Sequence, residues 1–149
     1  MFAPANLMHF ALDIPGVTHN FQVLAFSGRE ALNKPYAFVL DVVSERFEFD
    51  LQGLLGRPAY LAFDAHGHGR HGLILAAAQG ESGRRLTRYQ ITLGPQLDYL
   101  RHRHNQCIFK RRSVPAILAG ILEAHGILAS AYRLQLNGSD PARDYCVQY

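Results

Sequence analysis

The sequence predicts a mainly β or α+β fold in which several strands accompany one amphipathic helix. Three observations predict this fold class. Residues 36–43 form a largely apolar, strand-like run, and apolar residues alternate along residues 86–93, as they do in strands that bury one face. Residues 114–125 instead repeat their apolar positions with helical spacing. Segments rich in glycine and histidine, such as residues 65–69, separate the strand-like stretches and are typical of turns.

The first third of the chain predicts three strands. Residues 7–12 and 21–26 form the first two, and Gly28 lies where a hairpin turn is expected. Pro35 limits where the next strand can begin, because proline cannot donate to a ladder of backbone hydrogen bonds. Residues 36–43 are apolar on both faces, so we expect cover on both sides. One cover is the core, and the other is a second sheet, a helix or a neighbouring subunit.

The middle of the chain predicts a short helical turn and three further strands. Asp50 is a suitable N-cap for residues 50–55, and Gly56 is a suitable stop. Strands are expected at residues 59–63, 71–78 and 86–93, with a polar loop at residues 79–85. In the last strand one face holds Thr87, Tyr89, Ile91 and Leu93, which predicts a half-buried antiparallel strand.

The helix at residues 114–125 has clear boundaries. Ser113 is the expected N-cap, Pro115 lies in the first turn where its missing N–H is harmless, and Gly126 follows the end. The expected apolar face consists of Val114, Ile117, Leu118, Ile121, Leu122 and His125. The opposite face carries the small residues Ala116, Ala119, Gly120 and Ala124, which suggests a second cover. Further strands are expected at residues 132–136 and 145–149, around a loop at 137–141.

Composition fits one ordinary domain or a tight pair of small ones. The chain has 149 residues, of which 48% are hydrophobic and 18% are charged, so it can form a real core. No apolar stretch reaches the roughly 18 residues that a membrane helix needs. The opening residues lack the basic segment of a secretory signal peptide. The net charge of +3 is too small to indicate a nucleic-acid partner.

Three imidazoles lie close together at His66, His68 and His71, a grouping that can bind zinc, nickel or copper. Among nearby residues only Asp64 adds a further metal-binding group. Histidine is also well tolerated at the tip of a hairpin. We therefore assign no metal, and no cofactor, to the chain.

The sequence contains no recognisable hydrolase or nucleotide-binding motif. Its candidate serines, Ser27, Ser44, Ser82 and Ser113, all have structural interpretations as turn or cap residues. Cys107 and Cys146 are interpreted as small apolar fillers, because thiols in a cytosolic protein stay reduced and disulfides are rare there. We therefore predict that the chain is not an enzyme and has no catalytic residues.

A basic segment extends from Arg101 to Arg112. Its cations are Arg101, Arg103, Lys110, Arg111 and Arg112, with His102 and His104 between them. Together with Phe109 it could contact single-stranded nucleic acid. A solvated loop leading into the helix is the favoured interpretation. The next is an interface with an acidic surface, where complementary charge adds specificity and association rate.

Five short phrases, in a fixed order, resemble a known family. They are residues 27–38 (SGREALNKPYAF), 54–59 (LLGRPA), 71–74 (HGLI), 113–118 (SVPAIL) and 144–149 (DYCVQY). In this order they resemble the N-terminal region of VgrG proteins, the trimeric spikes of bacterial type VI secretion, which look like the hubs of contractile phage tails. The final phrase is the most specific. Residues 2–20 carry little of the resemblance beyond strand character.

The resemblance implies a structural role. It implies that residues 1–149 are a hub region with a tail-tube-like β-barrel and a packed helix, and a fragment of a longer spike protein. It also implies a homotrimer that joins the tube tip to the puncturing needle and helps deliver effectors. Gly28, Pro35, Gly56, Pro58, Gly72 and Pro115 would then set the fold and bind nothing.

The same resemblance implies partners and a location. The partners are an Hcp-like tube protein, baseplate proteins and effector or tip proteins, with neither nucleic acid nor stable membrane insertion. The protein would assemble in the bacterial cytoplasm and leave it, without a signal peptide, for the medium or a target cell. The fragment alone is expected to be monomeric or weakly associated. Two alternatives stay open: a phage or prophage baseplate hub, and a small β-rich domain that binds metal through His66, His68 and His71.

Overall fold

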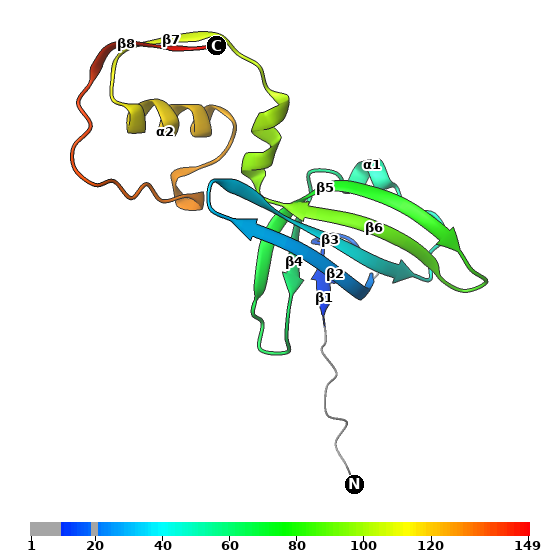
Figure 1. The fold of residues 1–149 in the computed structure, drawn as a ribbon. Coiled ribbons are helices and arrows are strands. Elements are labelled where there is room, and N and C mark those ends of the chain that lie inside the picture. Colours follow the sequence, from blue (N-terminus) through cyan, green and yellow to red (C-terminus); the bar gives the residue numbers. More distant parts are fainter. Residues whose placement is uncertain (1–9, 19–20) are drawn as a thin grey trace. The chain divides into compact units, whose positions relative to one another are not determined.

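The structure is a computed structural model that describes residues 10–18 and 21–149. It divides into two compact units, Met1–Pro95 and Gln96–Tyr149. The first unit contains strands β1 to β6 and the short helix α1; the second contains α2 and strands β7 and β8 (Figure 1). Each unit is described by itself below.

The first unit is a closed barrel of six antiparallel strands in the order β1-β2-β3-β6-β5-β4. The strands are β1 (Ala11–Asp13), β2 (Gln22–Ala31), β3 (Lys34–Ser44), β4 (Pro58–Ala62), β5 (Gly69–Ser82) and β6 (Thr87–Gly94). β1 pairs with β4 and closes the ring. Closure leaves the barrel without a free sheet edge. The predicted β-barrel is confirmed.

Alternation along the strands builds the barrel core. Leu40, Val42, Leu61, Ile74, Ile91 and Leu93 are fully buried. The ring of Tyr89 is buried as well, and its hydroxyl donates to Arg46 O at 2.8 Å, so its one polar group is satisfied. Burial raises the pKa of this hydroxyl. The predicted inward face of residues 86–93 is confirmed.

The predicted turn at Gly28 is wrong. β2 continues through Gly28, and the turn lies at Leu32 and Asn33, where Asn33 adopts a left-handed φ of 60°. Gly28 is instead needed inside the strand. A Cβ there would lie 2.1 Å from the ring of Phe38, its partner in the register with β3. Glycine in a strand often marks such a close approach.

Two other strand boundaries differ from expectation. Within the described residues the first strand is Ala11–Asp13, and residues 7–9 of the predicted strand lie outside them. β5 continues to Ser82, so most of the predicted polar loop at residues 79–85 is strand. The extension pairs Gln79 with Tyr89 and Ser82 with Thr87. Polar residues fit there because one side of this barrel wall is open to solvent.

The short helix α1 (Leu51–Leu54) follows the prediction. Asp50 Oδ1 accepts a hydrogen bond from the backbone N–H of Gly53 at 2.9 Å, which makes Asp50 the N-cap. Gly56 ends the segment with a left-handed φ of 74°. Leu54 contributes its side chain to the barrel core.

The second unit contains a 3₁₀ helix (Gln96–His102), β7 (Cys107–Arg112), α2 (Val114–Ala124), a 3₁₀ turn (Ala129–Ala131) and β8 (Arg143–Gln148). β7 and β8 pair as a separate two-stranded antiparallel sheet. α2 contacts β7. The predicted last strand is therefore confirmed, and its partner is β7.

The predicted caps of α2 are confirmed. Ser113 Oγ accepts from the N–H of Ala116 at 3.4 Å, and Gly126 takes a φ of 76° after the helix. A second acceptor was not predicted: Asp140 Oδ2 accepts from the N–H of Val114 at 2.9 Å. The expected faces are only partly correct, because Ile117 is buried whereas Leu118 is 45% exposed.

Two predictions for the second unit are wrong. Residues 132–136 form no strand, and Leu134 and Leu136 are exposed, because no neighbouring strand pairs with this stretch. The basic segment is not simply a loop, because its second half is strand β7. The sequence does not predict this strand because it contains three consecutive cations, Lys110, Arg111 and Arg112. Charged residues are uncommon in strands that pack on both faces.

Candidate assembly surface

Part of the outer face of the barrel carries small side chains on four neighbouring strands. The register aligns Ala76 of β5 with Thr92 of β6, Thr92 with Val39 of β3, and Val39 with Ser27 of β2. These four positions form one row across the barrel wall, and none carries a side chain larger than valine. We call it the small-residue row.

A second row runs beside the first. It consists of Ala78, Gln90, Asp41 and Ala25 on the same four strands. Gln90 Nε2 donates to Asp41 Oδ1 at 3.4 Å, so the carboxylate has a neutral partner on this face. Because Ala78 and Gly80 have little or no side chain, a hollow of about 350 Å³ lies at the end of this row.

These two rows expose mainly small side chains. Ala25, Ser27, Ala76 and Ala78 are exposed, and Val39 is half-buried. Small side chains let a second sheet or helix approach closely, and they lose little side-chain entropy on contact. Residues 36–43 were expected to be covered on both faces. Within the described part of the chain, Ala37 and Asp41 on the outer face stay exposed, so that cover is not intramolecular there.

The histidine-rich tip joins β4 to β5 and is organised by Asp64. Its Oδ1 accepts from the backbone N–H groups of His66 and His68 at 2.9 and 3.1 Å, and its Oδ2 lies 2.7 Å from Nδ1 of His68. The hydrogen bond from the His68 side chain, with help from these backbone N–H groups, holds the pKa of Asp64 below its ordinary value.

The three histidines of the tip do not converge. His71 lies on β5, where its ring packs against Tyr60 with the ring centroids 4.4 Å apart, and the rings of His66 and His68 are 6.5 Å apart. Over the residues that the structure describes, no group of three histidine, cysteine or acidic side chains is arranged to hold a metal ion. The tip is therefore a turn that is stabilised by a carboxylate.

The four candidate serines have structural contacts. Ser44 is buried and its Oγ accepts from the N–H of Arg46 at 3.2 Å. Ser82 Oγ accepts from the Thr87 hydroxyl at 3.3 Å, and Ser113 caps α2. Ser27 belongs to the small-residue row. None of these contacts is with a base that would activate the serine.

The residues of the basic segment, Arg101 to Arg112, lie in different surroundings. Arg101 pairs with Asp98, with a 2.7 Å distance between nitrogen and oxygen. Phe109 and Lys110 are neighbours on β7 and face opposite sides of its sheet. Cys107 and Cys146 are free thiols on the same sheet face, but Cys107 lies opposite Gln148 and Cys146 lies opposite Phe109. The segment therefore does not present one continuous basic surface.

The small-residue row was missed by sequence reasoning. Its signal was present in the run Ala76-Ala77-Ala78, but the sequence does not show which strands lie side by side. Only the register places Ala76 beside Thr92 and Val39.

Among the described residues, no helix is long and apolar enough to cross a membrane.

The chain thus combines a closed barrel with a small helix-and-strand unit. The chain belongs to the phage tail baseplate hub (GPD) family, which it matches over residues 29–149. Its relatives include spike proteins of type VI secretion. VgrG4b of Pseudomonas aeruginosa is 56% identical over 149 residues, which are all of this chain and 18% of that protein.

Two further similarities agree with this family. VgrG5 of Pseudomonas aeruginosa is 54% identical over 150 residues, covering all of this chain and 19% of that protein. The structure of the E. coli c3393 protein superposes with a TM-score of 0.83 at 25% identity, covering 93% of this chain and 38% of that one. That protein is described as a type VI secretion component similar in structure to the T4 bacteriophage tail proteins gp27 and gp5.

Proposed function

We propose that residues 1–149 are the hub region of a type VI secretion spike, joining the tip of the secretion tube to a puncturing needle. The 56% identity to VgrG4b over the whole chain carries this proposal. The chain spans less than a fifth of the length of the VgrG4b and VgrG5 proteins.

The role is mechanical and needs no chemistry from these residues. Three copies would place their barrels side by side in a ring that docks on an Hcp-like tube protein and on baseplate proteins. The small-residue row supports this role, because its small exposed side chains would let a neighbouring barrel approach closely on a barrel without a free sheet edge. The protein would assemble in the cytoplasm and leave with the spike, without a signal peptide.

A chimera tests the proposal in a working secretion system. This chain replaces the aligned region of VgrG4b in Pseudomonas aeruginosa, and VgrG4b released into the medium is measured by immunoblot. We expect release that depends on the contractile sheath. A chimera that is folded and trimeric in the cell but absent from the medium would contradict the proposal.

A substitution in the chimera tests the surface. Ala76→Arg places a long cation in the small-residue row, and we expect it to abolish most of the release without unfolding the barrel. Ala142→Arg is the matched control, because Ala142 is exposed in a loop of the second unit. Equal release from the two variants would show that the outer wall of the barrel is not an assembly surface.

A further inference from the structure

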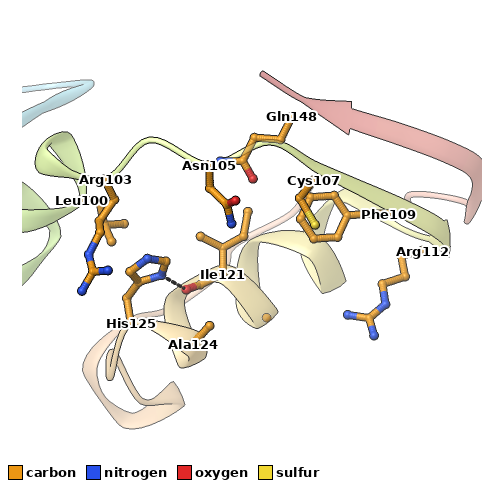
Figure 2. Close-up of a pocket in the computed structure, with 11 residues that line it drawn as sticks. Leu100, Arg103, Asn105, Cys107, Phe109, Arg112, Ile121, Ala124, His125 and Gln148 are labelled. Atoms are coloured by element: carbon orange, nitrogen blue, oxygen red, sulfur yellow. Dashed lines mark hydrogen bonds between the residues drawn. The ribbon is translucent and has the colours of Figure 1, made fainter.

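The second unit contains a pocket of about 330 Å³ between the β7–β8 sheet and α2. Figure 2 shows its lining side chains, which come from the 3₁₀ helix, the loop before β7, both strands and α2. The pocket lies wholly within residues 96–149, so it does not depend on how the two units are placed.

The middle of the pocket is apolar. Phe109 of β7 and Ile121 of α2 point toward each other across it, and Ala124 lines the helix side (Figure 2). Such a space accepts one apolar side chain and removes it from water.

Arginines lie at the two ends of the pocket. Arg103 stands near His125 at one end, and Arg112 stands at the other (Figure 2). The Arg112 guanidinium lies 3.5 Å from the position that a Cβ on Gly120 would take, so the glycine accommodates it. Within the described part of the chain, neither arginine forms an ion pair, whereas neighbouring Arg101 is paired with Asp98.

The net positive charge of the chain lies in the second unit, which contains this pocket. Residues 1–95 contain eight Lys or Arg and eight Asp or Glu, whereas residues 96–149 contain seven and four. The net charge of +3 therefore belongs entirely to the second unit. One of its four acids, Asp140, is already occupied as a cap of α2, and another, Asp98, pairs with Arg101.

We propose that this pocket binds an acidic peptide segment of a partner protein. One apolar side chain of the segment enters between Phe109 and Ile121, and flanking carboxylates pair with Arg103 and Arg112. Bidentate pairing with carboxylates is the geometry that arginine favours. This partner site goes beyond the hub function and does not require that the barrel assembles.

The lining favours a peptide over a nucleic acid. Nucleic-acid surfaces need a longer basic groove and aromatic faces that are free to stack on bases. Here Phe109 is half-buried and faces Ile121, and Lys110 lies on the other side of the β7–β8 sheet. A pocket with two cations and an apolar middle instead matches an acidic segment that carries one apolar residue.

The test measures binding of a labelled peptide to the purified chain by fluorescence anisotropy at low salt. The probe is a nine-residue peptide of Asp and Glu around one central Phe. We expect saturable binding that weakens when the central Phe is replaced by Ala. Absence of binding, or equal binding by the Ala peptide, would overturn the proposal. Tighter binding of a single-stranded oligonucleotide would overturn it as well.

Matched variants distinguish this pocket from general attraction. Arg112→Gln should weaken peptide binding about tenfold, since it removes a charge-assisted hydrogen bond. Lys110→Gln removes the same charge from the opposite sheet face and should change binding less than about threefold. Equal weakening by both variants would overturn the proposal.

Ala124→Leu keeps the charge and fills the pocket, so it should also weaken binding. If a variant fails to fold, the native chain can be titrated with the peptide, and the changes in its amide chemical shifts show whether the pocket is the binding site. Shifts centred on Phe109, Ile121 and Ala124 support the site, and shifts spread over the basic residues contradict it.

Discussion

The barrel and the second unit differ in how much apolar surface each buries. In the described part of the chain, the buried apolar side chains belong to the barrel unit except for Ile117 and Ile127. The second unit instead exposes large apolar side chains, among them Ile108, Tyr145 and Tyr149. Residues 96–149 thus have a small core of their own, which is typical of short chain segments whose stability depends on contacts with something else.

The two units also differ in charge and in sheet edges. The barrel unit has no net charge and closes its sheet, whereas the second unit carries the whole net charge of +3 and contains a two-stranded sheet that is not closed. A closed, neutral barrel suits lateral packing into a ring. An open, basic unit suits recognition of a separate acidic partner. The comparison therefore assigns different tasks to the two halves of one chain.

The largest expected effect contrasts a leucine from each unit. Leu40→Ala should destabilise the protein by about 2–5 kcal/mol, because Leu40 is fully buried and its loss leaves a cavity. Leu128→Ala should change stability by less than about 0.5 kcal/mol, since Leu128 is 61% exposed. Denaturant unfolding of both variants measures the contrast, and similar losses would contradict the difference in burial.

A smaller effect is expected from the glycines of the barrel wall. Gly28→Ala should destabilise the barrel by about 1–3 kcal/mol, because the added Cβ collides with the packed ring of Phe38. Gly80→Ala is the matched change in β5, where the nearest atom lies 3.5 Å away, and should alter stability by less than about 1 kcal/mol. Thermal unfolding distinguishes them; equal melting temperatures would refute this account of Gly28.

The smallest expected effect concerns pH at the tip between β4 and β5. Because the folded-state pKa of Asp64 is lowered, its contribution to stability is complete above the unfolded-state pKa and is lost as the pH falls through the folded-state value. His68→Ala should raise the Asp64 pKa toward its ordinary value, with little effect on global stability at this exposed site. Carboxyl chemical shifts recorded against pH measure it, and an unchanged Asp64 pKa would contradict the role of His68.

The sequence predicts elements with strong local signals better than it predicts strand pairing, for physical reasons. β3, β6 and α2 follow from local periodicity, and Asp50, Ser113 and Gly126 mark helix ends through contacts with nearby backbone. Each of these signals involves only residues that are close together in the sequence. Periodicity predicted only a mainly β or α+β fold; the β-barrel was implied by the resemblance to the hub family, which the match over residues 29–149 shows.

The features that the sequence does not predict depend on contacts between residues that are far apart in the chain. Gly28 looks like a turn residue until Phe38 is placed opposite it. Residues 107–112 look like a solvated basic loop until residues 143–148 pair with them. The small-residue row and the pocket beside α2 likewise exist only when separate strands and the helix are brought together, so neither candidate surface could be identified from local sequence.

Hydrogen exchange along the chain, followed by mass spectrometry, tests the central claim that the barrel is self-sufficient and the second unit depends on a partner. Exchange of each amide reports the free energy of local opening. We predict that β3 and β6 stay protected long after α2, β7 and β8 have exchanged. Equal protection across residues 10–149 in the isolated chain would contradict the account.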